Sequence, residues 1–118
     1  MTVAHYIVSL PEKQKQLMTI LRSWILDISA EVKESMHEEL QEPTFYLHGA
    51  LCYLTKDNNS VSIHFYQGKK LAKQFEELEM EDRKQMASYT FYGINGLEEH
   101  EDEVRKWLTA AAALQHRK

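Results

Sequence analysis

The chain has 118 residues, a formal net charge of −4 and a single cysteine, Cys52. This length fits one domain, residues 1–118, and one cysteine excludes an internal disulfide, as expected in a reducing compartment. The acidic balance argues against nucleic acid as a partner, because such affinity depends on a concentrated basic surface. The N-terminus does not resemble a signal peptide, and the apolar runs are far shorter than the ~20 residues of a membrane helix. We therefore expect a soluble, cytoplasmic protein without a membrane partner.

The first part of the chain predicts a short helical turn at 3–8 followed by a long helix from Leu10 to about Ser29. Ser9 and Glu12 have the spacing of a capping box, with Pro11 in the first helical turn. Apolar residues then recur at steps of three and four, which places one apolar stripe along the helix: Leu17, Ile20, Leu21, Trp24 and Ile28.

The middle of the chain predicts antiparallel strands. Residues 44–54 are rich in β-branched and aromatic residues and are interrupted at His48-Gly49. Residues 57–60 read Asp-Asn-Asn-Ser, a composition that favours a tight turn. Apolar and polar residues alternate after this turn, with the apolar positions at Val61, Ile63 and Phe65. We therefore expect residues 50–56 and 61–67 to pair as a hairpin.

The last part of the chain predicts a helix, a strand and a closing helix. Helical spacing follows Gly68, and residues 88–92 alternate as a strand that leads into a loop at 93–96. One face of the closing helix is apolar and contains Val104, Trp107, Leu108, Ala111 and Leu114. This order of elements predicts an α+β fold, in which an antiparallel sheet packs against the N-terminal and C-terminal helices.

Several short motifs carry a family resemblance. They read EPTFYLHG at 42–49, LCYL at 51–54 and IHFYQGK at 63–69, and SLPE at 9–12 precedes the long helix. With these motifs the chain resembles the YdhG-like family of small bacterial domains of unknown function, over nearly its whole length. The resemblance implies helices packed against an antiparallel sheet. Part of that family is described as frataxin-like intracellular iron chaperones, so the resemblance also implies weakly bound Fe²⁺ as a candidate cofactor.

Two positions depart from the family pattern. Gln41-Glu42 stands near the place where family members usually have Tyr-Gly. Family members also often carry Gly-Lys-x-x-Arg before the last strand, where this chain has Lys84 and then Ala87 in place of the arginine. An anion site that depended on that arginine would be missing from this chain.

The acidic residues form three clusters, at 31–42, 76–82 and 98–103. Clustered carboxylates are the ligands that hard or borderline divalent ions prefer. The alternative is solvated charge, which is the usual role of such runs and fits the third cluster best, at the start of a helix. The first cluster contains one base, Lys33, so its acids are the least neutralised. They supply the candidate iron ligands Glu34, Glu38 and Glu39.

Polar and aromatic side chains share the other face of the predicted strands. The candidate ligand-binding residues on this face and at its edge are Tyr46, His48, Tyr53, His64 and Tyr66. If a helix or a partner covers the face, they line a pocket, and if the face is open, they are ordinary solvent-side residues. An open or partly covered face is favoured, because one-sided burial is normal for antiparallel sheets.

The sequence contains no recognisable catalytic motif. It has no nucleophile elbow and no phosphate-binding loop, and Cys52 in a predicted strand has no neighbouring cation to activate it. Three functions remain. The first is an iron chaperone that carries Fe²⁺ on surface carboxylates. The second is a module, monomeric or homodimeric, that binds a small ligand or a protein partner through the aromatic sheet face. The third, an enzyme of unknown reaction, has the least support.

Overall fold

The computed structural model describes residues 1–81 and 85–115, so Lys84 and the last residue of the acidic cluster at 76–82 lie outside it. The described residues form five helices and one six-stranded antiparallel sheet with the strand order β1-β2-β3-β4-β6-β5. The predicted α+β fold is therefore confirmed. The elements are α1 (Val3–Val8), α2 (Glu12–Leu26), β1 (Lys33–Met36), β2 (Pro43–Tyr46), β3 (Ala50–Asp57), β4 (Ser60–Phe65), α3 (Gly68–Gln74), β5 (Glu79–Met80), β6 (Ala87–Phe91), α4 (Ile94–Glu99) and α5 (Glu101–Gln115).

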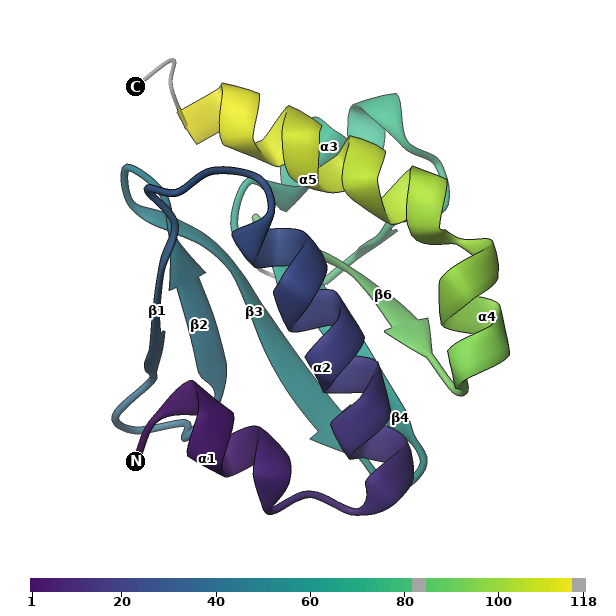
Figure 1. Cartoon of the computed structure of the whole chain (residues 1–118). Helices are drawn as coiled ribbons and strands as arrows, with labels where there is room; N and C mark the ends of the chain where they lie inside the picture. The colour runs from purple at the N-terminus through teal and green to yellow at the C-terminus, as the bar shows by residue number, and fades with distance from the viewer. Residues whose placement is uncertain (82–84, 116–118) are drawn as a thin grey trace.

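The long helices α2 and α5 lie on one side of the sheet (Figure 1). Figure 1 shows α2 crossing in front of the central strands, with α1 and α5 on the same side of the sheet. We call the sheet face beneath these helices the inner face and the opposite one the outer face. The core lies between the inner face and the helices, because the apolar stripes of α2 and α5 meet the apolar positions of the strands there. Its largest fully buried side chains include Trp107, Phe45, Phe65, Leu17, Met18 and Leu21. No described helix is long and apolar enough to cross a bilayer.

The start of α2 differs from the prediction. The capping box at Ser9 and Glu12 is wrong, because the Ser9 hydroxyl instead donates to the carbonyl oxygen of Tyr6 at 2.6 Å and Ser9 ends α1. Pro11 occupies the N-cap position of α2 with an extended backbone, and its side chain makes no capping hydrogen bond. The predicted apolar stripe is otherwise correct, since Leu17, Leu21 and Trp24 are buried.

The predicted hairpin and the last strand are confirmed. In the β3–β4 hairpin Leu54 lies opposite Ile63, and β6 pairs with β4 so that Tyr89 lies opposite Ile63 on the other side. The predicted loop at 93–96 is wrong, because α4 begins at Ile94 and buries Leu97 completely. The sequence analysis also missed the two-residue strand β5 at the edge of the sheet.

The closing helix α5 is anchored to the sheet at its end. Gln115 is buried, and its amide nitrogen donates to the carbonyl oxygens of Leu47 (3.1 Å) and Ala50 (3.0 Å). Hydrogen-bonded burial of this polar side chain fixes α5 on the turn between β2 and β3.

Candidate functional site

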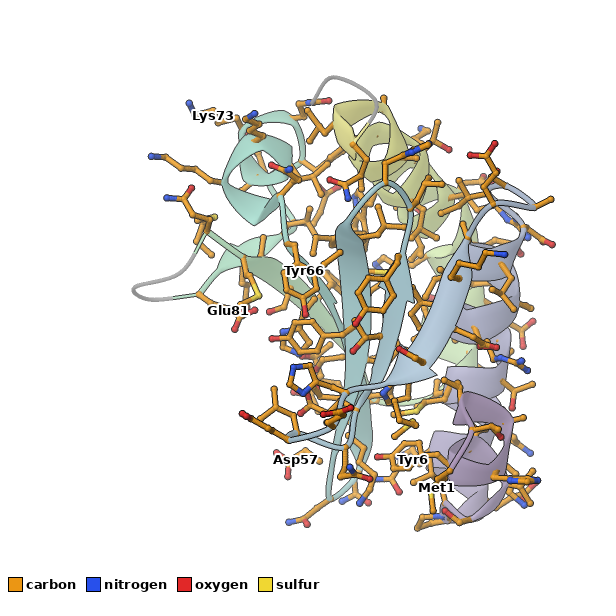
Figure 2. All side chains as sticks on the ribbon, turned by 90° about the vertical axis from the view of Figure 1, so that its left-hand side faces the viewer. Met1, Tyr6, Asp57, Tyr66, Lys73 and Glu81 are labelled. Atoms are coloured by element: carbon orange, nitrogen blue, oxygen red, sulfur yellow. The ribbon has the colours of Figure 1, made fainter. Side chains whose placement is uncertain are left out.

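The outer face of the sheet carries polar and aromatic side chains in the middle of its strands. Successive residues of a strand point to opposite faces, and Cys52, Leu54 and Ile63 occupy inner positions in the core. The residues between them, such as Tyr53 and His64, therefore point outward. Figure 2 shows Tyr66 and Glu81 on the side of the sheet away from α1, and among the described helices only α3 borders this side, at one end. The sequence favoured an open or partly covered face, and the face is partly covered, because Tyr53 is only 8% exposed.

Three of the predicted ligand-binding residues meet on this face. Tyr53 and His64 are direct cross-strand partners in β3 and β4, and their rings stack with centroids 4.5 Å apart and an interplanar angle of 6°. Tyr66 follows β4, and its ring meets that of Tyr53 at 5.4 Å and 53°. Such ring pairs are favourable at these distances, so the three side chains form one aromatic surface.

His64 is held by hydrogen bonds at both ring nitrogens. Nδ1 lies 2.7 Å from Oε2 of Glu81, which follows β5, and Nε2 lies 2.9 Å from Oγ1 of Thr55 in β3. The side chains of His64 and Glu81 are 15% and 25% exposed, so both contacts are at the surface but partly shielded from water. The two contacts fix the plane of the imidazole against Tyr53. We call Tyr53, His64, Tyr66 and Glu81 the outer-face cluster.

Carboxylates make the surroundings of the two phenols negative. Burial, and then the charges of Glu81 and Glu42, raise the pKa of Tyr53 to about 12. The pKa of Tyr66 is also raised, first by burial and then by its neighbours Tyr46, Cys52 and Glu42. A raised phenol pKa means that the folded protein disfavours a further negative charge at this point. Both tyrosines are therefore neutral at physiological pH in a negative environment.

The two remaining predicted ligand-binding residues have different positions. Tyr46, in β2, is near enough to Tyr66 to affect its pKa and so borders the outer-face cluster. His48 lies in the turn after β2 with a φ of 54°, and its Nε2 is 3.3 Å from Oε2 of Glu31. The structure therefore does not bring His48 together with Tyr53 and His64.

The structure also separates the predicted iron ligands. Glu34 lies opposite the core residue Phe45 and so points to the inner side, where Nε of Arg22 in α2 donates to both carboxylate oxygens at 2.8 and 2.9 Å. The sequence argument had missed this base, because Arg22 is distant along the chain. Glu38 and Glu39 instead line a separate hollow beside β1.

The described residues do not form a metal-ligand set. Across 1–81 and 85–115, no three His, Cys, Asp or Glu side chains are grouped closely enough to hold a metal ion. Nδ1 of His37, next to Glu38, accepts a hydrogen bond from the backbone N–H of Leu40 at 3.2 Å. A metal at Glu38 and Glu39 would have these two carboxylates as its principal protein ligands.

The order Glu81–His64–Thr55 resembles that of a hydrolytic triad, but the backbone around it does not suit acyl transfer. Such a site needs two donors that converge on the developing oxyanion. Thr55 lies inside the β3–β4 ladder, opposite Ser62, where successive N–H groups of a regular strand point in opposite directions. The buried thiol of Cys52, whose pKa is raised by burial, is no alternative nucleophile.

A second hollow, between α2 and α5, has a volume of about 460 Å³ and is lined by Trp24, Leu47, Leu108 and Arg105 among others. The guanidinium of Arg105 lies 5.6 Å from the centre of the Trp24 ring and pairs with Asp27 and Glu101 at 3.5 and 2.8 Å. Two carboxylates face this one guanidinium, so these three groups give the hollow no net positive charge.

Thr55, Glu81 and Glu42 are members or neighbours of the site that were not predicted from the sequence. The period-two pattern that places Tyr53 outward also places Thr55 outward, so this residue could have been found. Glu81 joins His64 only because β5 pairs with β6, and no local pattern indicated that pairing.

Comparisons of the chain with protein-family models, with curated proteins and with solved structures found no match.

Proposed function

We propose that this protein is a non-enzymatic binding module whose outer-face cluster contacts its ligand or partner. The single observation that carries the proposal is the meeting of Tyr53, His64 and Tyr66 on a face that no described helix crosses. Aromatic side chains with polar tips supply large contact area and directional hydrogen bonds at little entropic cost, which is why they are frequent in recognition surfaces. Hydrogen bonds between His64 and the side chains of Glu81 and Thr55 hold the imidazole in place before any ligand arrives.

The electrostatics of this surface favour a foreign partner over a second copy of the chain. A face-to-face homodimer would bring together two surfaces that each carry Glu81 and Glu42, and like charges at close range cost several kcal/mol by typical estimates. We therefore expect this face to bind a different molecule in preference to a second copy of the chain.

The first test is a fragment screen by NMR on the ¹⁵N-labelled full chain. We expect aromatic and charged organic fragments to shift the amide signals of β3, β4 and β6, and Tyr66→Ala to weaken these shifts. Tyr92→Ala is the matched control, because Tyr92 is 67% exposed and lies at the opposite end of the β4–β6 ladder. Shifts confined to the hollow between α2 and α5, or equal losses in both variants, would contradict the proposal.

Iron carriage, with membership of the YdhG-like family, is the alternative. It is supported by the motifs of the chain and by Glu38 and Glu39, which share one hollow, but Arg22 neutralises Glu34. Anaerobic calorimetric titration with Fe²⁺, with Mg²⁺ and Zn²⁺ as controls, tests it directly. Saturable binding of Fe²⁺ that the Glu38→Gln/Glu39→Gln double variant loses would establish this alternative. Heats of dilution alone would rule it out.

A further inference from the structure

We propose that the outer-face cluster binds the guanidinium group of an arginine side chain presented by a protein partner. This inference rests on the proposed function and specifies the chemistry of the partner. It combines two features of the surface that are independent of each other, namely the aromatic rings and the carboxylates that surround them.

The rings provide a surface for a planar cation. Tyr53 is fixed in its stack with His64 and is only 8% exposed, whereas Tyr66 is tilted by 53° from it and is half-buried. The two phenol rings are therefore set at an angle to each other, and Tyr66 is the ring that a partner can reach, with Tyr53 packed behind it. A cation within about 6 Å of such a ring is attracted by its negative face, and arginine stacks on aromatic rings more often than lysine does.

The charges closest to the two phenols are carboxylates, while Lys33, opposite Tyr46 in β1, is a base at the border of the same face. Glu81 and Glu42 both act electrostatically on Tyr53, and Glu42 also acts on Tyr66. Glu79 and Asp57, at the ends of β5 and β3, are further acids at the border of this face. A positively charged partner gains from these charges, whereas a nucleic acid, a phosphorylated peptide or an anionic lipid surface is repelled.

The shape and donors of guanidinium select it over a metal ion or an ammonium group. A metal ion needs converging ligands, and the described residues provide no group of three. Guanidinium is flat, so it can lie on Tyr66 while its edge donates hydrogen bonds to a carboxylate beside the ring. An ammonium group can satisfy the charge but cannot stack.

The experiment compares three peptides by NMR titration of the ¹⁵N-labelled full chain. The probes are acetyl-Gly-Arg-Gly-amide, the same peptide with citrulline, which replaces guanidinium by a neutral urea of the same shape, and the same peptide with lysine. We expect the arginine peptide to shift amides of β3 and β4 and to bind about tenfold more tightly than the citrulline peptide. Lysine should fall between them, and added salt should weaken the binding of arginine.

Two charge-matched variants locate the site. Glu81→Gln keeps a hydrogen-bonding group beside His64 but removes the charge, and we expect it to weaken binding of the arginine peptide several-fold. Glu103→Gln removes the same charge from α5, on the inner side of the sheet, and should leave the binding unchanged. Unshifted signals elsewhere in the spectrum verify that each variant is folded.

The outcomes separate the failure of this inference from the failure of the proposed function. If the citrulline or lysine peptide binds the outer face as tightly as arginine does, the assignment of guanidinium is wrong while the binding face stands. If Glu81→Gln and Glu103→Gln weaken binding equally, the attraction is one of net charge and the assignment to this cluster is wrong. If neither these peptides nor the fragments of the first screen shift outer-face amides, both proposals fall.

Discussion

At the scale of single residues, Gly68 shows how one position can determine the placement of an element. A Cβ atom at this position would lie 1.9 Å from the backbone nitrogen of Ala87 and 2.2 Å from the carbonyl carbon of Met86. Neither is the end of a flexible side chain, so β6 and the start of α3 can approach each other only because residue 68 has no side chain. The glycine of the IHFYQGK motif at 63–69 therefore has a packing role.

Gly68→Ala should accordingly destabilise the protein by about 3 kcal/mol, at the upper end of the cost of overpacking a well-packed site. Urea denaturation followed by circular dichroism measures this change in the free energy of unfolding. Gly96→Ala is the matched control, because a Cβ atom there meets nothing within 4 Å and Gly96 lies inside α4. We expect this control to be neutral or to stabilise by about 0.5–1 kcal/mol. Equal effects of the two substitutions would refute the close approach of α3 and β6.

At the scale of elements, α2 and the edge strand β1 are joined by Arg22 and Glu34. Nε of Arg22 donates to both carboxylate oxygens, and the two side chains are 34% and 21% exposed. The hydrogen bond to Glu34 raises the pKa of Arg22, while partial burial opposes this effect. The pair holds β1 beneath the helix and leaves Glu34 unavailable to a metal ion.

A double-mutant cycle tests this link. We expect Arg22→Met to cost about 1–2 kcal/mol, because it leaves the partly buried Glu34 without its partner. Adding Glu34→Gln in the Arg22→Met background should cost much less than it does in the wild type, giving a coupling energy of about 1 kcal/mol. Denaturant titrations of the four proteins provide the values, and a coupling energy near zero would mean that the pair does not hold β1 to α2.

The elements that the sequence predicted correctly are those whose pattern is local. Val61, Ile63 and Phe65 alternate strictly, and this alternation sufficed to predict the hairpin and its two faces. By contrast, β5 has two residues, and it exists as a strand only because β6 lies beside it. The helix α4 was missed since Gly93 and Gly96 suggested a loop, whereas the burial of Leu97 against the rest of the core favours the helix.

At the scale of the whole molecule, the candidate site also combines features that a local pattern predicts with features that depend on contacts between distant segments. Strand alternation placed Tyr53, His64 and Tyr66 on one face correctly, since side-chain direction in a strand follows from sequence position alone. The partners of these residues come from distant segments, as Glu81 does for His64. The separation of Glu34 from Glu38 and Glu39 likewise depends on which side of β1 faces α2, and the spacing of acids along the chain does not reveal it.

The tyrosines of the outer face also make the stability of the protein depend on pH between about pH 10 and 12. Burial and nearby carboxylates raise the pKa of Tyr53 from 10.0 to about 12, and the pKa values of Tyr66 and Tyr6 shift in the same direction. Below pH 10 the phenols are protonated in the folded and the unfolded chain, so their contribution to stability is fully present. Between pH 10 and 12 the unfolded chain loses these protons while the folded protein retains them, so the free energy of unfolding falls as the pH rises.

Tyr53→Phe removes one of these phenols, so its free energy of unfolding should fall less steeply between pH 10 and 12 than that of the wild type. Denaturant titrations at half-unit pH steps from 8 to 12 measure the slope, and absorbance at 295 nm follows the ionisation of tyrosine in the same samples. The control is Tyr92→Phe, which removes a phenol from a residue that is 67% exposed. If the wild type and both variants lose stability in parallel, Tyr53 retains no proton that the unfolded chain gives up, and the outer face is less shielded than its stacked rings indicate. A shallower slope in Tyr53→Phe alone would show that the folded protein disfavours ionisation of Tyr53 in solution, as its burial and the neighbouring carboxylates predict.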